Sequence, residues 1–313
     1  MAGKARFRID EAMPVPMQSQ DSWSVVAAQI AQATGSPFRV RRAVQAAGRC
    51  INSALVLEGY DSRYFVKLNA ASEVVMFEAE AAGLAALAEA GALRVPLPLC
   101  VGADLSRSWI VLEYLDLGAT PAAGWARLGA GLAELHRHVS PRYGWQRDNT
   151  IGSTPQINTP SANWVEFVRD RRIGFQLQLA ARNNYRGRLQ ALGSRLNERL
   201  DNFFKDYQPQ ASLLHGDLWS GNAAFLTDGE PVIFDPAVYF GDREADLAMT
   251  ELFGGFPAAF HSAYQAQWPL DPGYHVRKQL YKLYHLLNHL NLFGSGYLAE
   301  CEATLSALLS ELH

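Results

Sequence analysis

The segment from His215 to Asn222, which reads HGDLWSGN, combines residue types and a spacing that could carry out chemistry. It places Asp217 five residues before Asn222. In phosphoryl transfer to an alcohol, an aspartate at this position receives the hydroxyl proton, and the asparagine five residues later helps to hold a divalent cation. Four fixed residues at this spacing arise by chance in about 0.002 of sequences of this length. We therefore predict that Asp217 is the catalytic base and Asn222 a metal ligand. His215 should have a structural role, in which it bonds backbone groups and does not transfer a proton in the reaction.

The sequence after this segment predicts a β-hairpin. Residues 223–234 contain two short apolar runs separated by Asp228-Gly229, a pair that favours a two-residue turn. A turn of that length places Asn222 directly opposite Asp235, with Cβ atoms about 5 Å apart. An amide oxygen and a carboxylate at one point suit a hard divalent cation such as Mg²⁺. We expect Asp235 to be the second metal ligand.

A lysine and a glutamate near the N-terminus form a second candidate group. Lys67 shares one face of a predicted strand with Phe65, and an ammonium on an apolar face needs a partner. On the following predicted helix, Glu80 falls on the same stripe as Phe77 and Leu84. We therefore pair Glu80 with Lys67 and assign both to ATP binding, because such a pair aligns the α- and β-phosphates.

Two further segments could contact a nucleotide. Within residues 48–53, which lie between two predicted strands, we assign Gly48, Cys50 and Asn52 to phosphate binding through backbone N–H groups. The segment is neither a Walker A sequence nor a Gly-x-Gly-x-x-Gly loop, and a plain hairpin would also explain it. Backbone groups of Glu113 and Leu115 are assigned to adenine from their position alone.

The elements that must position these residues fall into two groups, which predicts an α+β protein. We expect five antiparallel strands at 38–47, 53–57, 63–68, 97–102 and 109–115, with one helix that Ser72 caps and that runs to about residue 90. The remainder should be mainly helical, with helices at about 122–138, 161–182, 188–206, 242–254, 274–293 and 296–312. Residues 1–117 would form a nucleotide-binding lobe, and residues 118–313 a larger catalytic and substrate-binding lobe.

Composition excludes several classes of protein. The chain has 313 residues, of which 49% are hydrophobic and 19% charged, as in globular proteins. A net charge of −3 lacks the basic excess that nucleic-acid binding usually needs. No uncharged apolar stretch reaches the ~20 residues of a membrane span, and no export signal is visible. The three cysteines are too few for a disulfide framework, so we expect a cytoplasmic protein.

Several motifs resemble the kinase-like phosphotransferases related to aminoglycoside and choline kinases, and within them the fructosamine kinase (ketosamine-3-kinase) family. The resemblance covers nearly all of the chain from about residue 20. The motifs are HGDLWSGN at 215–222, DPAVYFGDREADLAM at 235–249, FVKLN at 65–69, MFEAE at 76–80, DNTIG at 148–152 with Pro155, Gln156 and Asn158, and HLLNHL at 285–290.

This resemblance implies a bilobal protein-kinase-like fold that uses ATP and Mg²⁺ to phosphorylate the 3-hydroxyl of ketosamines such as fructosamine or ribulosamine. The acceptor would be a small molecule or a glycated protein amine, and the activity would serve deglycation repair. For the sugar we consider Asn149, Trp219 and Arg243, although a tryptophan such as Trp219 is a core residue about as often. Asp246 is assigned to bracing the catalytic loop.

Two alternatives remain open from the residues alone. One is a kinase for another small hydroxyl compound, such as an aminoglycoside, choline or a sugar amine. The other is a non-catalytic nucleotide-binding regulator, which is weakened because the five residues Lys67, Glu80, Asp217, Asn222 and Asp235 are all present. The oligomeric state cannot be inferred from the sequence.

Overall fold

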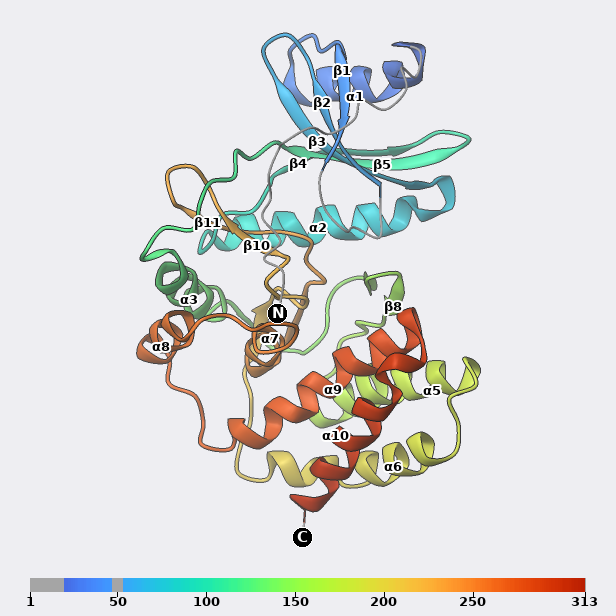
Figure 1. The fold of residues 1–313 in the computed structure, drawn as a ribbon, viewed down its shortest axis with the longest axis vertical. Coiled ribbons are helices and arrows are strands. Elements are labelled where there is room, and N and C mark those ends of the chain that lie inside the picture. The colour runs from blue at the N-terminus through green and yellow to red at the C-terminus, as the bar shows by residue number, and fades with distance from the viewer. Residues whose placement is uncertain (1–19, 47–52, 313) are drawn as a thin grey trace. The chain divides into compact units, whose positions relative to one another are not determined.

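The structure is a computed structural model that describes residues 20–46 and 53–312 (Figure 1). The chain divides into two compact units. The first contains the described residues up to Ala85 together with Pro96–Asp116, and the second contains Ala86–Val95 and the residues from Leu117 onward. Residues 86–95 thus pack with the second unit. The division at residue 117 into a nucleotide-binding lobe and a catalytic lobe stays a prediction.

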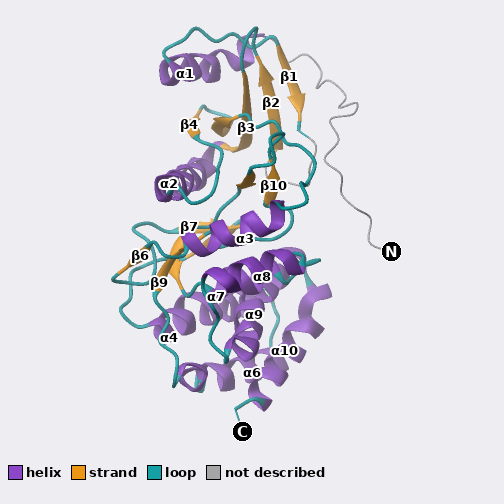
Figure 2. Cartoon of the chain, turned by 90° about the vertical axis from the view of Figure 1, so that its left-hand side faces the viewer, coloured by secondary structure: helices purple, strands orange, loops and turns teal. Residues whose placement is uncertain are grey.

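The first unit contains one five-stranded antiparallel sheet with the strand order β1-β2-β3-β5-β4 (Figure 2). Its strands are β1 (Arg42–Gln45), β2 (Ser53–Glu58), β3 (Arg63–Ala70), β4 (Pro98–Ala103) and β5 (Arg107–Glu113). The five predicted strands are therefore confirmed. Four of them end within two residues of the prediction, whereas β1 covers only 42–45 of the predicted range 38–47. Central strand β3 carries Lys67 opposite Ile110 of β5, so the lysine has a paired strand on each side.

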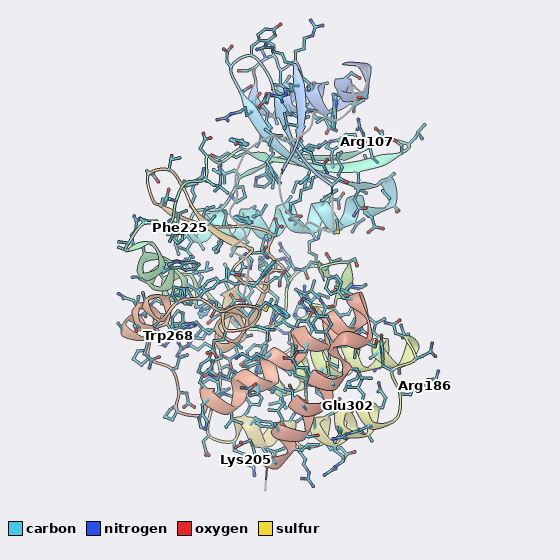
Figure 3. All side chains as sticks on the ribbon, in the orientation of Figure 1. Arg107, Arg186, Lys205, Phe225, Trp268 and Glu302 are labelled. Atoms are coloured by element: carbon cyan, nitrogen blue, oxygen red, sulfur yellow. The ribbon has the colours of Figure 1, made fainter. Side chains whose placement is uncertain are left out.

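Helix α1 (Ser24–Thr34) was missed by the sequence analysis, which expected one helix in this unit. Only two of its residues, Val26 and Ile30, are fully buried, so it lacks a long apolar stripe. It packs on the sheet, where Gln29 accepts a hydrogen bond of 2.8 Å from the indole nitrogen of Trp109. Arg107, labelled in Figure 3, lies over the ring of Trp23 at 4.4 Å and ties the start of the helix to β5.

The predicted helix after β3 is α2 (Val74–Ala90), but its start differs from the expectation. A 3₁₀ turn, η2 (Ala71–Glu73), precedes it. Ser72 lies inside this turn, where its hydroxyl bonds the carboxylate of Glu73 at 3.3 Å. The prediction that Ser72 caps the helix was therefore wrong.

The second unit is mainly helical, as predicted, and one of its helices was missed. Its α-helices are α3 (Gly124–Leu135), α4 (Trp164–Phe167), α5 (Gly174–Arg182), α6 (Arg188–Asn197), α7 (Glu244–Thr250), α8 (Ala258–Gln267), α9 (Tyr274–Phe293) and α10 (Leu298–Ser310). A π turn, η3 (Val168–Ile173), joins α4 to α5, and there are 3₁₀ turns at η1 (Gln20–Trp23) in the first unit, η4 (Leu200–Phe204) and η5 (Ser295–Tyr297). Helix α8 was not predicted; only Phe260 and Tyr264 of it are fully buried.

Helix α9 packs in the core of the second unit. Ten of its residues are buried, and seven of these join a hydrophobic core that includes residues of α5, α6 and α10. Figure 1 shows α9 and α10 side by side, and they are in contact. No helix in the described ranges 20–46 and 53–312 combines the length and apolar character needed to cross a bilayer.

Short strands in the second unit precede and follow the predicted catalytic segment. They are β6 (Val139–Ser140), β7 (Asn149–Ile151), β8 (Thr154–Gln156), β9 (Ala211–Leu214), β10 (Ala223–Phe225), β11 (Pro231–Ile233) and β12 (Tyr239–Gly241). Strand β9 pairs with both β6 and β12, while β7 pairs with β8 and β10 with β11. Only the β10–β11 hairpin was expected from the sequence.

The β10–β11 hairpin exists, but the predicted register was wrong by one residue. Phe225 pairs with Pro231, and Leu226 and Glu230 flank a turn of three residues instead of two. Gly229 has φ +82°, so it forms the left-handed residue that completes a type I turn with a bulge. The pair Asp228-Gly229 fits either turn, and the longer one places Asn222 opposite Phe234.

Candidate active site

The predicted catalytic segment is a loop that begins where β9 ends and is held by buried groups. Asp246 of α7 accepts hydrogen bonds from the backbone N–H groups of His215 (2.7 Å) and Gly216 (2.8 Å). The ring of His215 bonds the carbonyl of Phe234 at 3.0 Å through Nε2 and accepts the backbone N–H of Asp217 at 3.3 Å through Nδ1. The structural roles predicted for His215 and Asp246 are confirmed.

The side chain of Asn222 brings Asp217 and Asp235 together. Its Nδ2 donates to the carbonyl oxygen of Asp217 at 2.9 Å, to Oδ2 of the same residue at 3.3 Å, and to the carbonyl oxygen of Asp235 at 3.4 Å. The backbone N–H of Phe234 bonds the Asn222 carbonyl at 3.1 Å, as the observed hairpin register requires. Asn222 and Asp235 therefore converge, but not by the direct cross-strand pairing that we expected.

Asp235 reaches this point through an unusual backbone conformation. Its φ is +58°, in the left-handed region that few residues other than glycine adopt and that aspartate and asparagine tolerate best. The chain thus turns sharply directly after the hairpin. Residues with such dihedral angles cost roughly 1–3 kcal/mol and cluster at functional sites.

The electrostatic surroundings of Asp217 differ from those of a surface carboxylate. Burial, followed by the negative charges of Asp235 and Asp246, raises the pKa of Asp217 to about 7, against a smaller opposing effect of the Asn222 hydrogen bond. The carboxylates of Asp217 and Asp235 are therefore close enough to repel each other. Such a pair favours a bound cation.

The donor set fits a hard divalent cation. Because Nδ2 of Asn222 is used by Asp217 and Asp235, its Oδ1 points away from these carbonyl groups, and within the described part of the chain no hydrogen bond to Oδ1 is formed. Asn222 is only 5% exposed. Amide and carboxylate oxygens, which Asn222, Asp217 and Asp235 can offer, are the donors that Mg²⁺ prefers.

Lys67 and Glu80, both in the first unit, form the predicted ion pair. Nζ of Lys67 lies 2.6 Å from Oε1 of Glu80, and the side chains are 4% and 10% exposed. The pairing is confirmed. Its use in ATP binding stays a prediction.

The other predicted nucleotide contacts are less defined. Gly48, Cys50 and Asn52 lie outside the described residues. The backbone N–H of Glu113 bonds the carbonyl of Leu97 at 2.9 Å, and its carboxylate accepts from the Leu97 N–H at 3.3 Å. This N–H is therefore already used within the sheet, which weighs against its pairing with adenine. Leu115 is half-buried.

The three candidate sugar contacts have different surroundings. Trp219, two residues after Asp217, is half-buried, with its ring against the backbone of Gly221, where an added Cβ would lie 2.3 Å from Cη2. It stays a prediction. The contacts of Arg243 argue against a role in substrate binding. Its guanidinium donates to the carbonyls of Trp268 (3.0 Å) and Pro269 (2.6 Å) and stacks on the Trp268 ring, which Figure 3 labels.

The side chain of Asn149, the third candidate, is occupied by the protein itself. Its Nδ2 donates to the carbonyl of Val238 at 2.8 Å, and its Oδ1 accepts from Gln156 and Asn158, each at 2.8 Å. For Asn149 and Arg243 the structure thus favours a bracing role over direct sugar contact.

Two buried residues that support the loop were missed. His136 bonds Asp246 at 3.2 Å and the hydroxyl of Tyr264 at 2.8 Å, both through ring nitrogens. Arg172 bonds Asn158 at 2.8 Å. A single histidine or arginine within a helical pattern carries no motif, so neither role could be inferred from spacing.

Comparison with known proteins identifies related sequences. A family model described as fructosamine kinase matches residues 22–311. A probable ketoamine kinase of Synechocystis sp. is 47% identical over 296 residues, which cover 94% of this chain and 99% of that protein. A chloroplastic protein-ribulosamine 3-kinase of Oryza sativa subsp. indica is 45% identical over 253 residues, covering 80% of this chain and 73% of that protein.

Solved structures agree with these matches. A crystal structure from Haemophilus somnus described as "Putative fructosamine-3-kinase" superposes with a TM-score of 0.84 at 28% identity, covering 91% of this chain and 96% of that chain. A thermostable mutant of aminoglycoside phosphotransferase APH(4)-Ia gives a TM-score of 0.59 at 16% identity, covering 91% and 98%, which shows the fold alone. The predicted α+β fold of the protein-kinase-like phosphotransferases is confirmed.

Proposed function

The chain belongs to the fructosamine kinase family, and on that premise we propose that it is an ATP-dependent kinase that phosphorylates the 3-hydroxyl of ketosamines. A ketosamine is the sugar adduct left on an amine after glycation and rearrangement. Relatives at 47% and 45% identity are named as a probable ketoamine kinase and a protein-ribulosamine 3-kinase, which supports this substrate class. The observation that carries the proposal is the Asn222 side chain, which joins Asp217 to Asp235.

Asp217 is the proposed catalytic base. Its carboxylate lies beside Asn222, and its backbone is held through Gly216 and His215 by buried Asp246. In this role Asp217 would orient the acceptor hydroxyl and receive its proton as the oxygen attacks the γ-phosphorus of ATP. The rigid support matters because positioning supplies most of the catalysis in phosphoryl transfer.

Asn222 and Asp235 are the proposed ligands of Mg²⁺. When bound, Mg²⁺ would neutralise charge on the nucleotide phosphates. The chain contributes an amide oxygen and a carboxylate whose approach is fixed by the turn at Asp235, with φ +58°. Both proposed ligand atoms are oxygens, the ligand type that suits Mg²⁺ better than sulfur or imidazole nitrogen does.

Lys67 is the proposed contact for the α- and β-phosphates, with Glu80 holding its ammonium in place. The 2.6 Å distance between Nζ and Oε1 and the low exposure of both side chains restrict the lysine to few conformations. A cation already oriented by a buried carboxylate loses little freedom when a phosphate binds.

Trp219 is the proposed surface for the sugar. An indole ring can stack on the apolar face of a sugar, and Trp219 follows the catalytic base by only two residues. Its half-buried ring lies against Gly221, where a Cβ would collide with it. We place the protein in the cytoplasm and its activity in deglycation repair as parts of the same proposal.

The test is ATP consumption by the purified protein with Mg²⁺ and a panel of acceptors: fructosamine, ribulosamine, an aminoglycoside and choline. We expect turnover with one or both ketosamines, with the phosphoryl group on the 3-hydroxyl by NMR, and none with the other two acceptors. Turnover restricted to the aminoglycoside or to choline would reject the proposed substrate. Binding of ATP without transfer to any acceptor would point to a regulator.

A further inference from the structure

A π turn interrupts the helical segment between α4 and α5. In η3 the backbone N–H of Gly174 bonds the carbonyl of Arg169, five residues earlier. A Cβ on Gly174 would lie 2.3 Å from that oxygen, so the turn requires glycine there. Such turns redirect side chains and occur frequently at functional sites. Three residues of this turn are buried, and Arg172, which is 3% exposed, is the one that carries a charge.

Arg172 is a buried cation that is held by neutral groups. Its Nη1 donates to the carbonyl of Ile157 at 2.7 Å, and its Nη2 to Oδ1 of Asn158 at 2.8 Å. The guanidinium also lies 4.1 Å from the centre of the Tyr239 ring. Within residues 20–46 and 53–312 no carboxylate forms an ion pair with Arg172. Among the described residues, buried Nε of Arg172 has no hydrogen-bond partner. The bonds of Nη1 and Nη2 must therefore offset the cost of burying the charge.

From Asn158 the contacts continue to the backbone that follows Asp235. Nδ2 of Asn158 and Nε2 of Gln156 both donate to Oδ1 of Asn149 at 2.8 Å. Gln156 also donates to the carbonyl of Ala237 at 3.0 Å, and Asn149 donates to the carbonyl of Val238 at 2.8 Å. We call Arg172, Asn158, Gln156 and Asn149 the Arg172 network. Gln156 and Asn158 are 1% and 0% exposed.

The same backbone is fixed to the catalytic loop on its other side. The N–H of Ala237 bonds the carbonyl of His215 at 2.9 Å. A Cβ on Gly216 would lie 2.1 Å from the carbonyl oxygen of Ala237, so the two segments touch. Ala237 therefore lies between the Arg172 network and the loop that carries Asp217, two residues after Asp235.

We propose that the Arg172 network positions Asp235 relative to Asp217 and thereby sets the affinity of the metal site, so that its members, Asn149 included, are positioning residues and not sugar contacts. Asp235 follows the end of β11 by two residues and reaches the site through a left-handed turn. The hydrogen bonds to the carbonyls of Ala237 and Val238 attach the backbone that follows this turn to the network. This inference rests on the proposed function of Asp235 and Asn222 as metal ligands.

The first test is Asn149→Ala, which removes the bond to Val238 at a half-exposed position. We expect the affinity for Mn²⁺ in the presence of ADP, measured by electron paramagnetic resonance, to fall about 10-fold or more, as for other partners that orient metal ligands. The KM for the ketosamine should stay within about twofold. A KM that rises 10-fold with unchanged Mn²⁺ affinity would make Asn149 a sugar contact and overturn the proposal.

The second test compares two lysine substitutions in the same π turn. Arg172→Lys keeps the charge but loses the planar fork that bonds Ile157 and Asn158, so Mn²⁺ affinity should fall about 10-fold. Arg169→Lys is the matched control, because its guanidinium bonds the carbonyl of Asn197 and the carboxylate of Asp201, away from the network. Equal Mn²⁺ affinity in the two variants would also contradict the proposal.

The binding measurement needs no acceptor, which separates the two proposals. If the wild type binds Mn²⁺ and ADP but phosphorylates no ketosamine, the proposed substrate is rejected. The Mn²⁺ affinities of the variants then still test the positioning role. If Arg172→Lys does not fold, as its melting temperature would show, Asn149→Ala decides the question by itself.

Discussion

Nζ of Lys67 lies 2.6 Å from Oε1 of Glu80, and both side chains are almost completely enclosed by the first unit. The lysine comes from central strand β3 and the glutamate from helix α2. A buried pair of this kind is weak evidence for a gain in stability, because desolvation offsets most of the attraction. Its rigidity is better explained by a need to present the ammonium in one orientation.

Glu80→Gln should therefore impair nucleotide use more than it impairs folding. The neutral amide still accepts a hydrogen bond but no longer balances the ammonium, so we expect the KM for ATP to rise about 10-fold or more, with a stability loss of roughly 1–3 kcal/mol. Steady-state kinetics and urea unfolding measure both. Glu89→Gln, at an exposed position of the same helix, is the control and should leave both unchanged. An unaltered KM in Glu80→Gln would remove the pair from nucleotide binding.

Asp217→Asn should separate chemistry from binding. The amide cannot receive the hydroxyl proton, so kcat should fall about 10²–10⁴-fold, whereas ATP affinity should stay near that of the wild type. Rapid-quench or steady-state assays with a ketosamine and a fluorescent ADP analogue measure these quantities. The matched control is Asp228→Asn in the hairpin turn, where the carboxylate only accepts the N–H of Glu230. A wild-type kcat in Asp217→Asn would contradict the assignment of the base.

Asp235→Asn should remove the metal dependence of nucleotide binding. Asparagine tolerates the left-handed conformation observed at this position, so the variant tests the charge and not the backbone. We expect Mg²⁺-dependent ADP binding, followed by calorimetry, to weaken about 100-fold or more, and Asp235→Ala to abolish it. ADP binding in EDTA serves as the internal control, and its affinity should be the same in the variants as in the wild type. Metal dependence that persists in both variants would rule out Asp235 as a ligand.

The site shows what local sequence patterns can and cannot specify. The pairing of Lys67 with Glu80 followed from strand alternation and a helical stripe, because each pattern fixes a face within one element. The hairpin was also predictable, but its register was not, because Asp228-Gly229 fits turns of two or three residues. One residue of difference placed Asn222 opposite Phe234.

The convergence of Asn222 and Asp235 instead depends on a single left-handed residue and on tertiary contacts, which no local rule specifies. Arg172 is the clearest case. Its role arises because a π turn rotates it inward, and the sequence of a π turn does not differ visibly from that of an α-helix. Helices α1 and α8 were missed for a related reason, since each has two fully buried residues and therefore a weak periodic signal.

Gly216→Ala should destroy the contact between the catalytic loop and the segment after Asp235. The residue has φ +82°, and the added Cβ would lie 2.1 Å from the Ala237 carbonyl oxygen, which belongs to the backbone and cannot rotate away. Gly35→Ala is the matched control: its φ is +69°, but no atom lies within 4 Å of the added Cβ. Conformational strain alone should cost Gly35→Ala about 1 kcal/mol with full activity. Gly216→Ala should lose more stability and most of its activity, and equal urea midpoints with retained activity would contradict the close contact.

Glu251 links the end of α7 to α9 and should make stability depend on pH in the acid range. Burial raises the pKa of its carboxyl, but hydrogen bonds from Lys278, Lys282 and Tyr274 outweigh burial and lower the pKa from 4.5 to about 2. Because the folded-state pKa is below the unfolded one, the ionised carboxylate stabilises the fold above about pH 4.5, and this contribution is lost as the pH falls toward 2.

Glu251→Gln should therefore be less stable than the wild type at neutral pH by roughly 1–3 kcal/mol, and the difference in unfolding free energy should narrow below about pH 4.5. Urea unfolding at a series of pH values measures this difference. Glu134→Gln is the control, because the Glu134 side chain is 65% exposed and lies 3.6 Å from Arg137, so its removal should change stability by less than about 0.5 kcal/mol. A Glu251→Gln difference that stays constant down to about pH 3 would show that the three hydrogen bonds do not depend on the charge of the carboxylate.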